Sequence, residues 1–188
     1  MSGDAFDKDV VERTLHEDKD AFRGIVEKYT PQFLSLAVKM TGNVHTAEEA
    51  VQEIFLKIFS ALESYNRKRR FFSWAYTIAV NYLRSELRKN YVKQQMASVP
   101  YDDTLINNSS TYADPEKELI QAEGERLVLK ALDQLKPKYR EIFILRQLQG
   151  LSVTDTAQVM GIPEGTVKTL LFRAKKAILA ALKHMQWQ

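Results

Sequence analysis

Residues 151–176 read Leu-Ser-Val-Thr-Asp-Thr-Ala-Gln-Val-Met-Gly-Ile-Pro-Glu-Gly-Thr-Val-Lys-Thr-Leu-Leu-Phe-Arg-Ala-Lys-Lys, and this stretch decides the fold of the second half of the chain. Its apolar spacing predicts a short helix, a glycine turn and a second helix with a basic outer face. That order is typical of a helix-turn-helix, whose second helix enters the DNA major groove. The alternative is a three-helix fold without a role in DNA binding.

Local signals agree with this interpretation. Ser152 can cap the first helix, Gly161 suits a left-handed turn residue, and Pro163 fits the start of the second helix. The residues expected to face the core are Val153, Ala157 and Met160 in the first helix and Val167, Leu170, Leu171, Ala174 and Ile178 in the second.

The opposite face of the second helix carries the candidate DNA contacts. Lys168, Thr169 and Arg173 are best placed for base edges, since an Arg can form two hydrogen bonds to guanine. Phe172 can touch a thymine methyl group. Three lysines are better placed for phosphates: Lys175, Lys176 and Lys183.

Working outward from this stretch, charge is unevenly distributed along the 188 residues, although the net charge is only +3. Residues 67–93 have a net charge of +7 and residues 161–188 one of +4. The net charges of residues 1–66 and 94–160 are −5 and −3. Because phosphate contacts supply most non-specific DNA affinity, the two basic blocks suggest two footprints on one polyanion. Solvated helix faces are the alternative.

Composition excludes several classes of protein. The chain has no cysteine, so disulfides, thiolate metal sites and cysteine nucleophiles are ruled out. The three histidines lie far apart in sequence, and we expect no metal and no cofactor. No apolar run approaches 18 residues and no signal peptide opens the chain, so we expect a cytoplasmic protein. Sparse Gly and Pro, with apolar residues at helical spacing, predict an all-α fold.

Residues 94–113 lose helical periodicity and contain turn-forming residues, which predicts a flexible linker. Asp114-Pro115-Glu116 has the features of a new helix start. We therefore expect two small helical domains, an N-terminal one at 1–95 and a C-terminal one at 114–188, joined by a linker at 96–113.

The N-terminal domain has its own helix signals. Pro31 is expected to open a helix that ends near Met40, with Gly42 as its C-cap. Thr46 and Glu49 stand at capping-box spacing. The helix that follows has an apolar stripe from Ala47 to Leu62 and a mostly acidic opposite face. That face is either solvated or a docking surface for a basic partner.

Residues 67–93 combine eight basic side chains with six aromatic ones. In a helix over residues 72–89, one face would form core: Phe72, Tyr76, Ala79, Val80, Leu83 and Leu87. The opposite face would carry Trp74, Thr77, Asn81, Arg84 and Arg88. Aromatic and basic residues together suit bases that have left the duplex. The alternative is that Trp74 packs beneath the loop Arg67–Arg70 as local core.

Three motifs resemble the extracytoplasmic-function (ECF) group of the sigma-70 family. Residues 161–175 resemble the second half of that family's promoter −35-binding region. Ala47-Glu-Glu-Ala-Val-Gln-Glu-Ile-Phe-Leu-Lys is similar to its polymerase-binding helix, and Phe72-Ser-Trp-Ala-Tyr-Thr-Ile-Ala-Val-Asn to its −10 melting element. The three motifs occur in the family's order and span nearly the whole chain.

The resemblance implies a sigma factor without catalysis of its own, built from sigma domain 2 and a helix-turn-helix sigma domain 4. It implies a polymerase surface of Glu48, Glu49, Gln52, Glu53, Phe55 and Lys57. The implied −10 contacts are Arg69, Arg70, Phe71, Trp74, Tyr76, Thr77, Asn81, Arg84 and Arg88. The implied −35 contacts are Pro163, Glu164, Gly165, Thr166, Lys168, Thr169, Phe172, Arg173 and Lys176.

The implied partners are core RNA polymerase, promoter DNA that is double-stranded at −35 and melted at −10, and an anti-sigma protein, in the cytoplasm at the nucleoid. Leu170 replaces a usual Arg, and Thr169 a usual Ser, which leaves the −35 sequence open. Two other hypotheses are a helix-turn-helix regulator that does not join polymerase and a scaffold that binds only an inhibitor. A helical nuclease is a third, but it would need clustered carboxylates with His or Asp partners.

Overall fold

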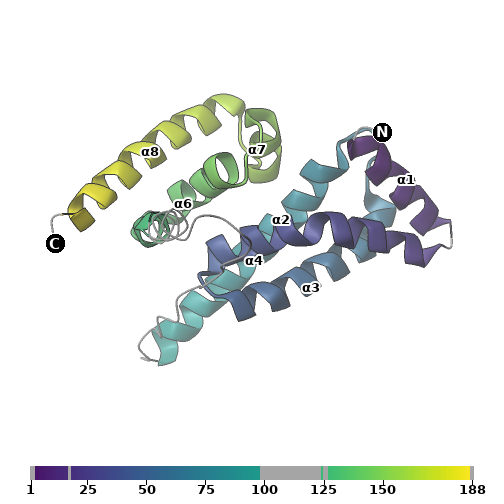
Figure 1. Cartoon of the computed structure of the whole chain (residues 1–188), viewed down its shortest axis with the longest axis horizontal. Helices are drawn as coiled ribbons and strands as arrows, with labels where there is room; N and C mark the ends of the chain where they lie inside the picture. The colour runs from purple at the N-terminus through teal and green to yellow at the C-terminus, as the bar shows by residue number, and fades with distance from the viewer. Residues whose placement is uncertain (1–2, 17, 98–123, 125–126, 187–188) are drawn as a thin grey trace, which may run out of the picture. The chain divides into compact units, whose positions relative to one another are not determined.

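The computed structural model describes residues 3–16, 18–97, 124 and 127–186. Within these ranges the regular structure is helical, as the sequence predicts. The chain divides into two compact units, one drawn mainly from residues before 105 and the other mainly from those after it (Figure 1). The predicted linker lies outside the described residues except for 96 and 97, and the predicted helix start at 114–116 lies outside them entirely.

The first unit contains α1 (Gly3–Leu15), a 3-10 turn (Lys19–Phe22), α2 (Arg23–Thr41), α3 (Val44–Ala61), a second 3-10 turn (Leu62–Ser64) and α4 (Phe71–Ala97). Helix α2 packs against α3 and α4, and α1 contacts both α2 and α4. Helix α4 runs two residues past the predicted domain end at 95.

The link between α2 and α3 is a tight turn at Gly42, as predicted. Gly42 adopts a left-handed conformation with φ of 74°, and its N–H donates to Val38 O. The predicted cap at Thr46 is wrong, because Asn43 caps α3 by accepting a hydrogen bond from Thr46 N at 2.9 Å. Helix α3 therefore begins earlier than the capping-box pattern indicated.

The prediction that Pro31 opens a helix is also wrong, since Pro31 lies inside α2. The apolar stripe of α2 continues on both sides of the proline, with Ile25 and Tyr29 before it and Phe33 and Leu36 after it. All four side chains are at most 1% exposed. Packing along this stripe outweighs the hydrogen bond that a proline removes from the helix interior.

The core of the first unit is rich in aromatic rings. Phe33 lies 5.3 Å from Tyr76 and 5.4 Å from Phe55, and Tyr29 stacks on Phe33 at 5.6 Å, all between ring centroids. The predicted inner face of α4 is buried at Tyr76, Ala79, Val80 and Leu83, and half-buried at Phe72 and Leu87.

The second unit contains a helical segment at 127–133, α6 (Pro137–Phe143), a π-helical turn (Ile144–Leu148), α7 (Val153–Met160) and α8 (Glu164–Gln186). Helix α6 packs on α8. The predicted core stripe of α8 is buried at Val167, Leu170, Ala174 and Ile178 and half-buried at Leu171. Leu170 is thus a packing residue in this fold.

The α7–turn–α8 segment follows the predicted pattern at its ends. Ser152 Oγ accepts a hydrogen bond from Asp155 N at 2.9 Å, and Gly161 has a φ of 65°. The inward face of α7 differs from the prediction, because Thr156 and Val159 are buried while Val153 and Ala157 are only half-buried. Thr156 tolerates burial because its hydroxyl donates to Ser152 O.

Candidate nucleic-acid interface

The loop before α4 is a compact turn that exposes basic side chains. Asn66 Oδ1 accepts from Lys68 N at 3.0 Å, Asn66 O accepts from Arg69 N at 2.9 Å, and the Tyr65 hydroxyl donates to Arg69 O at 2.6 Å. Arg69 and Arg70 are both exposed. These hydrogen bonds therefore fix the backbone of the loop that carries the basic side chains.

Trp74 is half-buried, which agrees in part with the hypothesis that it packs as local core, while its contact with unpaired bases stays a prediction. Its ring lies 4.9 Å from Tyr65 and 5.5 Å from Phe71, between centroids, which makes it part of the packing behind the loop. Burial, and then the negative charges of Asp4 and Asp7, raise the pKa of Tyr65 to about 12. The remaining exposed part of the Trp74 ring is accessible to a ligand.

Two predicted DNA contacts of the first unit are wrong. Phe71 is 0% exposed and Tyr76 is 1% exposed, so neither side chain reaches the surface. Phe71 packs on Tyr29 and Tyr65, and Tyr76 packs on Phe33 and Phe72. Burial raises the pKa of Tyr76 well above its ordinary value. Both rings hold α4 in place and are packing residues.

The rest of the predicted α4 face is accessible. Asn81 and Arg88 are exposed, and Thr77 and Arg84 are half-buried. Arg84 Nη1 donates to Asn81 Oδ1 at 3.1 Å, which leaves the amide N–H donors of Asn81 to a ligand. The Thr77 hydroxyl donates to Ser73 O at 2.7 Å, so its oxygen is free to act only as an acceptor for a base or phosphate donor.

The predicted face of α8 is exposed at all nine positions: Pro163, Glu164, Gly165, Thr166, Lys168, Thr169, Phe172, Arg173 and Lys176. Phe172 is 71% exposed. Glu164 Oε1 accepts a hydrogen bond from the Thr154 hydroxyl at 2.8 Å, which links the start of α8 to α7. The sequence prediction of which α8 residues point outward agrees with the structure throughout.

The acidic face of α3 is exposed at Glu48, Glu49, Gln52 and Glu53. Lys57 is exposed too, and its ammonium lies over the Tyr82 ring of α4, 5.5 Å from the centroid. Phe55 is 8% exposed and packs on Phe22 and Phe33, so its prediction as a surface contact is wrong. Leu56, an apolar side chain beside these acids, is 60% exposed and was not among the predicted contacts.

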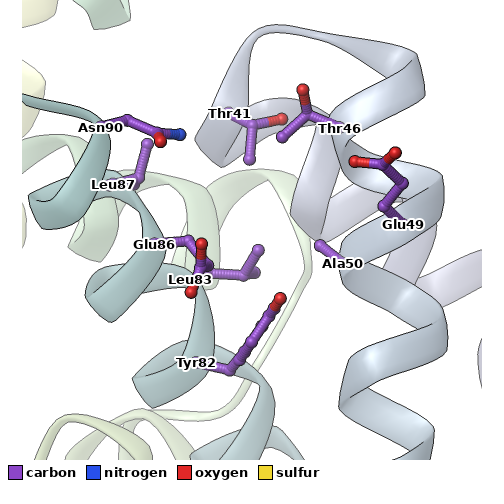
Figure 2. A pocket seen from close by; sticks show the side chains of 9 residues that line it. All are labelled: Thr41, Thr46, Glu49, Ala50, Tyr82, Leu83, Glu86, Leu87 and Asn90. Carbon is purple, nitrogen blue, oxygen red and sulfur yellow. The ribbon is translucent and has the colours of Figure 1, made fainter. Parts of the chain in front are cut away.

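A shallow pocket lies where the start of α3 meets α4 (Figure 2). Its volume is about 70 Å³, well below the roughly 300–1,000 Å³ of a typical small-molecule site. Glu49, Tyr82 and Glu86 are among its lining residues. The pKa of Tyr82 is raised overall. Burial contributes most, followed by the charges of Glu86 and Glu53, and the charge of Lys89 opposes the rise only in part. The pocket is an indentation in an acidic surface.

In the part of the chain that the structure describes, His, Asp and Glu side chains do not gather into a group able to hold a metal ion. Among the same residues, none of the helices combines the length and apolarity that crossing a membrane requires.

Comparison with known families assigns both units. Residues 25–91 match the model of sigma-70 region 2, and residues 125–178 match that of sigma-70 region 4. The first match contains α3, the loop before α4 and most of the exposed α4 face. The second contains α6, α7 and the exposed face of α8.

Full-length relatives are similar along almost the whole chain. The chain is 32% identical to an ECF RNA polymerase sigma-E factor of Haemophilus influenzae, over 95% of this chain and 96% of the relative. It is 31% identical to the ECF RNA polymerase sigma factor SigW of Bacillus subtilis, over 89% and 92%. The fold resembles that of the sigma factor RpoE in complex with the anti-sigma factor NepR from Bartonella quintana, with a TM-score of 0.71, 23% identity and coverage of 86% and 96%.

Proposed function

This chain belongs to the ECF group of the sigma-70 family of RNA polymerase sigma factors, and we propose how its surfaces divide the work of promoter recognition and opening. A sigma factor binds core RNA polymerase, recognises the −10 and −35 elements and promotes DNA opening. The observation that carries our assignment is that each matched region presents its own accessible basic face, one on α4 and one on α8.

The exposed face of α8 is the −35 reader in this proposal. Lys168, Thr169 and Arg173 contact base edges, and Lys176 contacts the phosphates. Pro163, Glu164, Gly165, Thr166 and Phe172 complete the face. This assignment is supported by the left-handed turn at Gly161 between α7 and α8, which matches the turn of a helix-turn-helix.

The −10 element is handled by the loop before α4 and by the outer face of that helix. The proposed residues are Arg69, Arg70, Trp74, Thr77, Asn81, Arg84 and Arg88, without the buried Phe71 and Tyr76. Flipping a base out of the duplex costs a few kcal/mol, which stacking on Trp74 and ionic contacts of the arginines offset. The N–H donors of Asn81 are available to a base edge.

Helix α3 is the proposed polymerase contact, through Glu48, Glu49, Gln52, Glu53 and Lys57. We add Leu56 to this set and leave out Phe55. An exposed leucine within an acidic face matches the usual interface composition, in which an apolar centre is surrounded by polar residues.

We further propose that the chain acts in the cytoplasm at the nucleoid, without catalysis of its own. RpoE was solved in complex with the anti-sigma factor NepR, and we propose an inhibitor of that kind as a partner here. A regulator that does not join polymerase is not favoured, because the relatives similar along the whole chain are sigma factors.

Reconstitution tests the function directly. The purified chain, added to core RNA polymerase, is expected to give run-off transcripts from a cognate promoter and to co-purify with the polymerase. Leu56→Glu should weaken co-purification, whereas Lys130→Glu, an exposed change in the other unit, should not. The proposal would be contradicted if the chain gave no transcript from any promoter tried and also did not co-purify with the polymerase.

A further inference from the structure

The residue before helix α4 is not of a type that usually caps a helix. The first residue of α4, Phe71, follows four basic residues, and Arg70 stands where Ser, Thr, Asp or Asn usually caps a helix. Positive side chains near a helix N-terminus are unfavourable, because the helix dipole is positive there. The N–H groups of the first turn therefore need an acceptor from elsewhere in the fold.

Asp4 of α1 supplies that acceptor from 67 residues away in the sequence. Its Oδ1 accepts a hydrogen bond from Phe71 N at 3.2 Å, and its Oδ2 pairs with Lys8 Nζ at 2.9 Å. Burial raises the pKa of Asp4, but the bonds from Lys8 and Phe71 N–H and the charge of Arg70 lower it overall. The carboxylate is thus held ionised beside the start of α4.

Helix α1 is itself fixed in place, so the position of Asp4 is defined. Asp7, 1% exposed, accepts a hydrogen bond from the Tyr29 hydroxyl at 2.7 Å and pairs with Lys28. Further along α1, Glu12 Oε1 lies 3.2 Å from Arg67 Nη1, in the basic loop. Acidic residues of α1 therefore contact α2, the loop and the first residue of α4.

We propose that Asp4 is a positioning residue for promoter opening, which sets the start of α4 and so the placement of Arg69, Arg70 and Trp74. Asp4 does not contact DNA in this account. It acts through its hydrogen bond to Phe71, which fixes the point where the loop ends and the helix that carries Trp74 and Asn81 begins. The proposal rests on the proposed −10 role of α4, and it extends that role to the N-terminal helix.

Amide hydrogen exchange in the full chain tests the Asp4–Phe71 hydrogen bond without polymerase. Asp4→Ala should speed exchange at the Phe71 N–H by about fivefold, the effect of losing a typical helix cap. Asp4→Asn retains an acceptor oxygen and should restore most of the protection. Asp9→Ala, an exposed change on the same helix, is the matched control and should leave exchange unchanged.

With core polymerase, Asp4→Ala should slow opening of the −10 region by about fivefold, measured by permanganate reactivity, with −35 footprinting unchanged. Asp4→Asn should recover most of the rate. Asp4→Ala that behaves like Asp9→Ala in both measurements would overturn the proposal. Loss of helix content in both Asp4 variants would overturn it as well, since Asp4 would then be a general folding residue. If no promoter opens even with the wild-type chain, the proposed function fails, while exchange at the Phe71 N–H still decides whether Asp4 holds the start of α4.

Discussion

The two helices assigned to DNA, α4 and α8, meet the solvent in different ways. All nine candidate residues of α8 are exposed, and its core stripe lies on the opposite side. Of the nine candidates on α4 and in the loop before it, two are buried and three are half-buried. Tyr76 packs on Phe33 of α2, and Phe71 packs on Tyr65 at the start of α4. Tyr65, Phe71 and Trp74 form one aromatic group at that point.

This difference suits the two tasks proposed for the helices. Groove reading needs an open face that fits a rigid duplex, and α8 offers one. Capture of a flipped base needs a supported aromatic ring and a defined loop, because an unpaired base is no longer held in orientation by the duplex. The aromatic group behind Trp74 provides that support, and the Tyr65–Arg69 hydrogen bond defines the loop.

The comparison is tested most strongly by removing one phenylalanine from each helix. Phe71→Ala should lower the free energy of unfolding of the first unit by about 3–5 kcal/mol, because Phe71 is fully buried. Phe172→Ala, at a position that is 71% exposed, should change stability by less than about 0.5 kcal/mol. Urea unfolding followed by circular dichroism measures both. Similar losses would show that α8 is packed as closely as α4.

A second prediction concerns base reading by α8. Arg173→Ala should weaken binding of the polymerase complex to the cognate −35 element by about 1–3 kcal/mol and reduce discrimination against mutated elements. Lys183→Ala should weaken binding to the cognate and to the mutated elements to the same extent, since a phosphate contact carries no sequence information. Titrations on cognate and altered duplexes measure this. Unchanged discrimination in the Arg173 variant would remove it from the reading set.

A third prediction uses the tyrosines that distinguish the first unit. Burial raises the pKa of Tyr65 to about 12 from an ordinary value of 10, and burial also raises the pKa of Tyr29 and Tyr76. The unfolded chain releases the Tyr65 proton at lower pH, so the contribution of Tyr65 to stability is full below pH 10 and is lost as the pH rises toward 12. Thermal unfolding should show a smaller alkaline loss in Tyr65→Phe than in the wild type. An equal loss would mean that Tyr65 is solvated.

The smallest expected effect is at the Glu12–Arg67 pair, where both side chains are more than half exposed. Glu12→Gln should change stability by less than about 1 kcal/mol, because water and salt screen exposed pairs. The same thermal measurement, made at low and high salt, checks this. A larger, salt-insensitive loss would indicate that the loop is held by this pair and not mainly by the Asp4 and Tyr65 hydrogen bonds.

Local sequence signals predicted the parts of the fold that depend on local chemistry. The glycine turns at Gly42 and Gly161, the Ser152 cap and the exposed face of α8 all follow from backbone preference and helical period. The all-α class follows from the same periodicity. These features need no knowledge of which segments meet in space.

The errors occur where distant segments pack together. Pro31 is accommodated inside α2 by a stripe that packs against other helices. Phe71 is buried by Tyr29 of α2 and by Tyr65 before α4, which the helical period of its own helix cannot reveal. For Tyr76 and Phe55 the helical period did predict burial, and only the family resemblance placed them among the contacts. The Asp4–Phe71 hydrogen bond joins residues 67 positions apart and leaves no local signal, although Arg70, which is not a usual capping residue, indicates that a partner is needed.

The division of labour between the two helices is tested most directly by one paired measurement with core polymerase on a cognate promoter. Footprinting reports occupancy of the closed complex, and permanganate reactivity at −10 reports opening. We predict that Asn81→Ala leaves occupancy of the closed complex near the wild-type level and reduces opening. Arg173→Ala is predicted to reduce occupancy of the closed complex, and opening falls as a consequence. Equal losses of occupancy and opening in both variants would contradict the account.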